Sequence, residues 1–451
     1  MSEQGQEPPK SIIKFANAVF ILGIIFWILI TIYASYRIFY PMHAPNLGDE
    51  GIENFYKFSI IFGVVFSLLL GLGLKKLSNN LKVNLSVLFF TIGISIYGFE
   101  TYLEFKHKDT TTRMDKIADL RDSGVNAFPN VFPSNFIGSD GLKSDEGRIY
   151  PLGTISNSTT ILSNEAGFYP IVETDEYGFN NSKGLYMKNK VDILLTGDSY
   201  TEGFSVNSDE TISAVLRQLN YNAISVGKSG NGPLLELAAL KEYGEPFKPK
   251  IVLWLYYIND LGGLKIEMKS SILNKYLNED GYSQKLIYRQ EEIDIVLKNY
   301  IKSEWSKKQK SEKIANHPII KIAKLYNLRM RIKLEPTSEP IVLPTPVFEN
   351  VLSKAKQTVS QWNGKIYFVY LPDWNRYSSD TEHPNRNFVI KAVQKLNIPI
   401  IDIHTEVFEP HLDPLSLFPF RSYNHYNAEG YKLVAEAIER RLVSDGYILI
   451  K

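Results

Sequence analysis

The sequence predicts an α/β protein, in which three transmembrane helices precede a parallel sheet that helices cover on both faces. Two observations carry this prediction. The first hundred or so residues contain three long apolar runs, each able to cross most or all of a bilayer. From about residue 191, short apolar runs alternate with helical patterns, which is typical of buried parallel strands. A chain of 451 residues is long enough for two or three such units.

The apolar runs are the candidate membrane spans. Phe15–Tyr36 has 22 residues without a charge, and Phe58–Leu74 and Val83–Phe99 have 17 each. At about 1.5 Å per residue, such helices suit a hydrocarbon core about 30 Å thick. Buried core helices are the alternative, but three such runs cluster before any other domain signal. A cleaved signal peptide fits less well, because two more runs follow the first.

Positive charges predict the orientation of the spans. Lysines lie before the first run and between the second and third, whereas acids dilute the basic residues between the first and second. The positive-inside rule then places the N-terminus in the cytoplasm and everything after Phe105 outside. Tyr33, Tyr97 and Tyr102 fall at the outer ends, as in an aromatic belt. We therefore expect a multi-pass membrane protein with three spans and an extracytoplasmic domain.

Composition excludes several classes of function. The net charge is +1, which gives no reason to expect a nucleic-acid partner. The chain has no cysteine, so it has no disulfide, no thiol nucleophile and no cysteine-ligated metal. The seven histidines do not show the spacing of a metal site, and we expect neither metal nor cofactor.

The outer domain is predicted to hold its chemistry at the carboxyl ends of its strands. The expected strands are Val191–Thr196, Ala223–Val226, Ile251–Tyr257, Ile366–Leu371 and Ile398–Ile403. Gly197, Asp198 and Ser199 lie where the first strand ends and a helix begins. A sharp turn there would expose the Ser199 hydroxyl beside free N–H groups at the helix start. The alternative is that Asp198 or Ser199 merely caps the helix.

Three further stretches follow strands or precede a helix. Glycines follow the second strand, Asn259 and Asp260 follow the third, and His425 lies shortly before an amphipathic helix near the C-terminus. Taken singly, each also fits a structural role as a glycine-rich turn, a helix cap or a surface histidine. Together, they could converge on one rim of the sheet.

In this order, the stretches resemble the sequence blocks of the SGNH, or GDSL-type, hydrolases over roughly residues 191 to 443. The matching residues are Gly197-Asp198-Ser199, Ser229-Gly230, Ile258-Asn259-Asp260 and His425. The resemblance implies a three-layer α/β/α sandwich with Ser199 as nucleophile and His425 as general base. It also implies an oxyanion hole made by the N–H groups of Ser199 and Gly230 and by Asn259. These are the donors that a tetrahedral intermediate requires.

Two positions depart from the family pattern. Tyr257 replaces the glycine of the third block, and Ser422 stands where the family has the acid three residues before the histidine. Asp413 or Asp402 could replace that acid through space, or a backbone carbonyl could leave a Ser–His dyad; no third residue is assigned. His404 and His411 are rival bases, but neither is followed by the His-x-Asn-x-x-Gly pattern that His425 begins.

The remaining segments divide the chain further. We expect a transmembrane anchor over 1–105, a β-rich leader over 106–190 and the SGNH-like domain over 191–451. A helical insert at about 261–344 has ten Lys or Arg against two Glu between Lys302 and Lys333. It could contact anionic lipid or an acidic glycan, although a solvated helical hairpin fits as well. The Asp-x-x-Gly-Phe stretch of the leader could line the cleft or serve packing alone.

Three functions fit these observations. The first is a membrane-anchored SGNH-type serine esterase that removes acyl groups, acetyl most simply, from an envelope glycan or lipid. The second is an O-acyltransferase that passes the same acyl group to an extracytoplasmic polysaccharide, which would need a membrane partner as acyl donor. The third, suggested by Ser422, is a non-catalytic glycan-binding module on the same fold.

Overall fold

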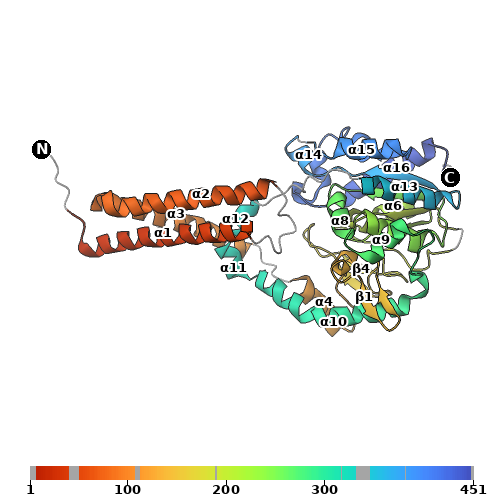
Figure 1. Cartoon of the computed structure of the whole chain (residues 1–451), viewed down its shortest axis with the longest axis horizontal. Coiled ribbons are helices and arrows are strands. Elements are labelled where there is room, and N and C mark those ends of the chain that lie inside the picture. The colour runs from red at the N-terminus through yellow and green to blue at the C-terminus, as the bar shows by residue number, and fades with distance from the viewer. Residues whose placement is uncertain are drawn as a thin grey trace. The chain divides into compact units, whose positions relative to one another are not determined.

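The computed structural model of the chain describes residues 7–39, 50–106, 112–187, 190–315, 317–331, 346–380 and 382–447 (Figure 1). Two compact units are present. The first comprises Met1–Thr110 with Asn316–Pro336, and the second comprises Thr111–Ala315 with Thr337–Lys451. The described part of the leader from Thr112 onward therefore belongs to the second unit, whereas residues 317–331 of the insert belong to the unit of the apolar helices.

The first unit contains the three predicted apolar helices. These are α1 (Lys10–Phe39), α2 (Glu50–Lys76) and α3 (Asn79–Lys106), and α1 packs against both others (Figure 1). All three are long and apolar enough to cross a membrane. Large apolar side chains such as Leu22 and Phe58 are more than 60% exposed, which a helix in water would not tolerate along its length. The short helices α11 (Pro318–Ala323) and α12 (Tyr326–Arg331) pack against α3.

The second unit is built on a five-stranded parallel sheet. Its strands are β5 (Ile193–Thr196), β6 (Ala223–Ser225), β7 (Ile251–Tyr256), β8 (Lys365–Tyr370) and β9 (Ile400–Asp402). Their order is β6-β5-β7-β8-β9, and every pair is parallel. All five predicted strands are confirmed, with ends shifted by at most two residues.

Successive side chains along each strand point to opposite faces of the sheet and contribute to two hydrophobic cores. Val252, Trp254 and Tyr256 of β7 point to one core, and Leu253 and Leu255 point to the other. The helices α7 (Pro233–Ala239), α9 (Ser271–Asn278), α13 (Pro346–Ser360) and α15 (Arg386–Lys395) cover the first core. The helices α6 (Ile212–Gln218) and α16 (Ala428–Ser444) cover the second. The predicted three-layer α/β/α sandwich is therefore confirmed.

Shorter elements connect these layers. Between successive strands of the sheet, the chain forms α5 (Ser199–Glu202), η2 (Leu240–Gly244), α8 (Asp260–Glu267), η3 (Leu286–Tyr288), α10 (Gln290–Ala315) and α14 (Asn375–Ser378). Near the C-terminus lie η4 (His404–Phe408), η5 (Pro414–Leu417) and η6 (Pro419–Arg421). The described part of the insert, up to Arg331, is mainly helical.

The leader adds small elements to the outer unit. They are α4 (Arg113–Asp122), η1 (Pro133–Phe136) and two antiparallel pairs, β1 (Leu142–Ser144) with β2 (Gly147–Ile149) and β3 (Thr159–Ile161) with β4 (Ile171–Glu173).

The Asp-x-x-Gly-Phe stretch of the leader has a packing role. The buried Asp175 carboxylate accepts hydrogen bonds from the N–H groups of Tyr177 and Phe179, both at 2.9 Å, and from Asn181 Nδ2 at 2.8 Å. Asn181 in turn exchanges two hydrogen bonds of 2.8 Å with the backbone of Ser225 in β6. The stretch thus fixes the leader onto the edge of the sheet.

Candidate active site

The turn after β5 is shaped by lack of space and by a helix cap. A Cβ on Gly197 would lie 2.8 Å from the Leu255 carbonyl oxygen, so only glycine fits beside β7. The Asp198 carboxylate then accepts the Tyr200 N–H at 2.9 Å and caps α5. Ser199 is the first residue of this helix. Asp198 thus forms the cap, whereas Ser199 is less open than the sequence predicts, because it is only 8% exposed.

Ser199 and His425 come together although 226 positions separate them in the chain. Ser199 Oγ lies 2.7 Å from His425 Nε2, a distance suited to a hydrogen bond from the hydroxyl to the imidazole. His425 is held just before α16, where Asn427 caps the helix by accepting the Gly430 N–H at 3.0 Å. The His-x-Asn-x-x-Gly pattern is therefore a helix start that presents the imidazole.

A third residue, which the sequence did not reveal, lies on the other imidazole nitrogen. Glu165 Oε2 is 2.7 Å from His425 Nδ1, and the same oxygen accepts the His425 N–H at 3.1 Å. Glu165 belongs to the leader, between β3 and β4, where no family block predicts an acid. Its contact with His425 depends on folding of the leader against the sandwich, so no local pattern signals it.

Charge couples Glu165 to His425. Burial raises the pKa of the Glu165 carboxyl, but the charge and hydrogen bonds of His425 lower it by more, so it lies below its ordinary value. Burial lowers the pKa of His425, but the carboxylates of Glu165, Asp198 and Glu202, Glu165 foremost, together raise it by more, so the pKa of the imidazole lies above its ordinary value. The carboxylate thus stabilises a positive charge on the imidazole.

The acids that the sequence suggested are engaged elsewhere. Asp413 pairs with Arg421, and Asp402 pairs with Arg386. Ser422 is exposed, and its hydroxyl donates to the Phe420 carbonyl oxygen.

The rival histidines also have other partners. His404 contacts Arg376 and Tyr377, and His411 Nδ1 accepts the Asp413 N–H. Of the three histidines weighed as base, His425 alone contacts Ser199 among the described residues.

The sheet order, the turn after β5 and the Ser199–His425 contact correspond to the arrangement that the sequence blocks imply. The sandwich domain is SGNH-like. The carboxylate beside its histidine differs from the family pattern, because it comes from the leader rather than from the loop before the histidine.

Comparisons with known proteins find solved structures to which this chain is similar. No family model and no curated protein matches the chain. Three similar solved structures, each with a TM-score of 0.31 or 0.32, are described here. A protein from Desulfitobacterium hafniense DCB-2, described as lipolytic and of the G-D-S-L family, is 14% identical. The similarity covers 55% of this chain and 98% of that protein. The acetyl xylan esterase AlAXEase is 13% identical, with coverages of 56% and 100%. The lipase/acylhydrolase from Enterococcus faecalis is also 13% identical, with coverages of 57% and 97%.

Aromatic rings enclose the imidazole of the SGNH-like domain. The Tyr200 ring lies 4.6 Å and the Phe204 ring 5.4 Å from His425, measured between centroids. Tyr257, which replaces the family glycine, packs on Tyr200 at 4.4 Å. The tyrosine that replaces the family glycine thus adds a second ring to the aromatic cluster beside the imidazole. It leaves the Ser199–His425 contact intact.

The predicted oxyanion donors lie on the same edge of the sheet. Gly230 follows β6 with φ of +78°, and a Cβ there would lie 2.6 Å from Ser134 Oγ, so the turn requires glycine. Asn259 follows β7 and precedes α8. The Ser199 N–H, the third predicted donor, lies at the start of α5. No contact among the described residues joins Gly230 or Asn259 to Ser199, so the oxyanion hole stays a prediction.

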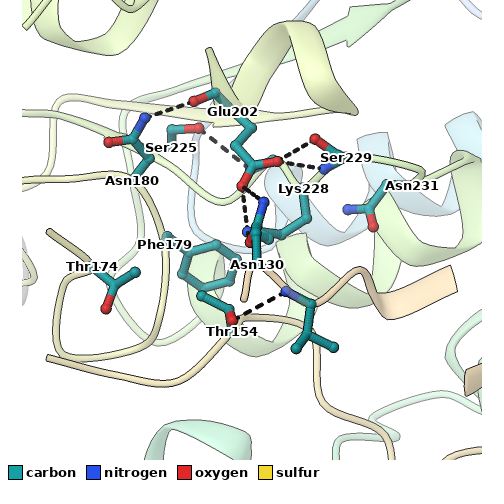
Figure 2. A network of polar contacts seen from close by, with 12 residues as sticks. Asn130, Thr154, Thr174, Phe179, Asn180, Glu202, Ser225, Lys228, Ser229 and Asn231 are labelled. Carbon is teal, nitrogen blue, oxygen red and sulfur yellow. Dashed lines mark hydrogen bonds and ion pairs between the residues drawn. The ribbon is translucent and has the colours of Figure 1, made fainter. Parts of the chain in front are cut away.

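A buried ionic network is centred on Glu202, the last residue of α5 (Figure 2). The Glu202 carboxylate receives the Lys228 ammonium, Asn130 Nδ2 at 2.9 Å and the Ser229 N–H at 2.8 Å, and the Ser229 hydroxyl donates to it as well. Lys228 Nζ also donates to Asn130 Oδ1 at 2.7 Å. Burial raises the pKa of Glu202, but Lys228 and the hydrogen bonds of Ser229 together lower it by more, so the carboxyl stays ionised. The network joins α5, the turn before Gly230 and the leader.

Removing the cation from this network is expected to destabilise the fold. Lys228→Met leaves the Glu202 carboxylate buried without a counter-charge, which costs about 3–5 kcal/mol. Thermal unfolding of the full chain in detergent measures the loss. Lys250→Met is the matched control, because Lys250 is 71% exposed in its pair with Asp192, and such pairs contribute at most about 1 kcal/mol. Equal effects of the two substitutions would contradict a stabilising role of the buried pair.

Several buried acids interact in and near the turn after β5. Burial raises the pKa of Asp198 to about 6, with His425 acting in the opposite direction. Burial also raises the pKa values of Glu236 and Asp260 well above their ordinary values, and the acids reinforce one another. No group of three or more His, Asp or Glu in the described part of the chain could hold a metal ion. Glu236 and Asp260 therefore prefer to hold protons in the folded state.

The proton on Glu236 makes stability depend on pH. Because the pKa in the folded state exceeds the unfolded value of 4.5, stability falls as pH rises above that value. We expect Glu236→Gln to raise the melting temperature relative to wild type at pH 8 and to change it little at pH 4. Glu429→Gln, at a side chain that is 56% exposed, serves as control. A gain of the same size at both pH values would rule out ionisation as its cause.

Proposed function

We propose that the chain is a membrane-anchored serine esterase that removes acyl groups, acetyl most simply, from a glycan or lipid of the cell envelope. The observation that carries the proposal is the chain of contacts from Ser199 Oγ to His425 Nε2 and from His425 Nδ1 to Glu165, both at 2.7 Å. A serine hydroxyl needs an adjacent base to become a nucleophile, and the base needs a group that fixes its tautomer.

The proposed reaction follows from these contacts. With Nδ1–H donated to Glu165, the neutral Nε2 of His425 accepts the Ser199 proton while Oγ attacks the ester carbonyl carbon. The oxyanion is held by Gly230, Asn259 and the Ser199 N–H, and the imidazolium returns its proton to the departing alkoxide. Water, deprotonated by the same histidine, then releases the acyl group from Ser199.

The proposed setting is the outer face of a membrane. It is supported by three helices of sufficient length and apolar character and by the distribution of lysines around them. Under this proposal, α1–α3 cross the bilayer with the N-terminus in the cytoplasm, and the SGNH-like domain meets its acylated substrate outside.

Labelling with a fluorophosphonate probe tests the proposal. The full chain in detergent should form a covalent adduct that peptide mass spectrometry assigns to Ser199, and it should hydrolyse 4-nitrophenyl acetate. The binding module, which was suggested by the missing acid at Ser422, predicts folded protein without an adduct. Adding a glycan acceptor to the ester assay separates hydrolysis from transfer, because an acyltransferase would divert acetyl from water to sugar.

The oxyanion hole can be tested at Asn259. Asn259→Ala is expected to lower kcat by about 10²–10³-fold, with a smaller change in KM, because the lost hydrogen bond forms mainly in the transition state. Steady-state hydrolysis of the chromogenic ester measures both constants. Asn278→Ala, on the exposed end of α9, is the control. An unchanged kcat in Asn259→Ala would remove this residue from the hole.

A further inference from the structure

The basic insert returns the chain to the membrane unit, where α12 docks on α3. The Glu100 carboxylate of α3 accepts the N–H groups of Asn327 and Leu328, each at 2.8 Å, and Asn327 Nδ2 at 3.0 Å. One glutamate therefore satisfies backbone donors at the start of α12, which otherwise have no partner within a helix.

A second glutamate one helical turn later completes the attachment. Glu104 accepts Asn327 Nδ2 at 2.8 Å, and Lys321 Nζ of α11 lies 3.9 Å from its carboxylate. Glu100 is 0% and Glu104 is 6% exposed. Buried carboxylates persist only where donors or cations satisfy them, so these contacts tie α11 and α12 to the C-terminal end of α3.

The side chains that point away from α3 combine apolar and basic character. Ile319 is 70% and Tyr326 41% exposed, and Lys324 and Arg331 are exposed beside them. Residues 317–331 contain four Lys or Arg and no Asp or Glu. A segment with an apolar face, a tyrosine and an excess of positive charge is suited to the boundary between acyl chains and anionic headgroups.

We propose that α11 and α12 form an interfacial helix pair that lies on the bilayer surface at the C-terminal end of α3 and binds the phosphate groups of anionic lipids. Ile319 and Tyr326 enter the boundary region, and Lys324 and Arg331 pair with headgroups. The inference rests on the proposed crossing of the membrane by α1–α3. The bilayer is favoured over an acidic glycan because α3 already holds the pair where the span ends and because apolar side chains accompany the cations.

This attachment changes how the SGNH-like domain is connected to the membrane. The chain passes between the two units near residues 110, 315 and 336, rather than once. A domain connected at three places has fewer orientations available than one on a single tether. The interfacial pair would thus restrict which acylated groups near the surface reach Ser199.

Lipid binding by the full chain tests the charge component. Native mass spectrometry in detergent, titrated with phosphatidylglycerol or phosphatidylcholine, measures the affinity for each. We expect preferential binding of phosphatidylglycerol and about a tenfold loss of that affinity in K324Q/R331Q, with K302Q/K310Q on α10 as matched control. Equal loss in both double variants, no preference for phosphatidylglycerol, or preferential binding of an acidic polysaccharide would overturn the proposal.

Depth measurements separate this inference from the proposed membrane crossing. Because the chain has no cysteine, Ile319→Cys and Phe62→Cys each introduce one site for a fluorophore. In nanodiscs, lipids that carry a quencher near the headgroup should quench the label at 319. Lipids that carry it deep in the acyl chains should quench the label at 62, within α2. Quenching at 62 without quenching at 319 overturns the interfacial pair alone; absence of both overturns the crossing as well.

Discussion

Replacing Ser199 by alanine is expected to abolish fluorophosphonate labelling and to lower kcat for ester hydrolysis by about 10⁶-fold. The Ser199 Oγ atom is the proposed attacking atom, and its 2.7 Å contact with His425 Nε2 is the route by which it loses its proton. Without the hydroxyl, no acyl-enzyme forms, and only the weak effect of the surrounding donors on water attack remains. Steady-state hydrolysis and peptide mapping of the adduct measure the two effects.

Ser422→Ala is the matched control for this substitution. Ser422 is an exposed serine near the histidine in sequence, and its hydroxyl contacts only the Phe420 carbonyl oxygen among the described residues. Its loss should leave labelling and kcat unchanged. Retained hydrolysis in a folded Ser199→Ala protein, with a melting temperature close to that of wild type, would reject Ser199 as the nucleophile.

Replacing Glu165 by glutamine is expected to lower kcat by about 10⁴-fold. The carboxylate accepts the Nδ1–H of His425, which leaves Nε2 free to take the Ser199 proton. A glutamine can donate to Nδ1 instead, and the imidazole then carries its hydrogen on Nε2, in the wrong tautomer. The residue acts through His425 and is therefore a positioning residue.

The pH profile distinguishes this role from a structural one. Glu165 raises the pKa of His425, so loss of its charge should lower that pKa and move the acidic limb of the kcat/KM profile to lower pH. Glu165→Asp should recover part of the activity because it keeps the charge. Glu173→Gln removes a carboxylate of the same leader that accepts from Thr159, and it should alter neither kcat nor the limb. A smaller kcat with an unmoved limb would indicate that Glu165 only supports the leader.

Local patterns in the sequence determined much of this architecture. Continuous apolar runs such as Ile251–Tyr256 predict strands buried on both faces, because side chains of such strands meet a helical layer above and below. Long uncharged runs predict α1–α3 for a similar reason, since each hydrophobic length is set by the segment itself. Because Ser199, Gly230 and Asn259 each follow a predicted parallel strand, the sequence also indicated that they lie at the same edge of the sheet, where the carboxyl ends of the strands meet.

Only the tertiary structure decided how distant segments complete the site. Glu165 reaches His425 across 260 positions, Asn130 reaches Glu202 across 72, and Asn327 reaches Glu100 across 227. A hydrogen bond between such segments requires that both be placed by the whole core, and it leaves no periodicity or spacing in either of them. The sequence therefore determined the sandwich, the candidate spans and the serine and histidine blocks, whereas the folded chain alone decided which acid faces the imidazole and where the basic insert docks.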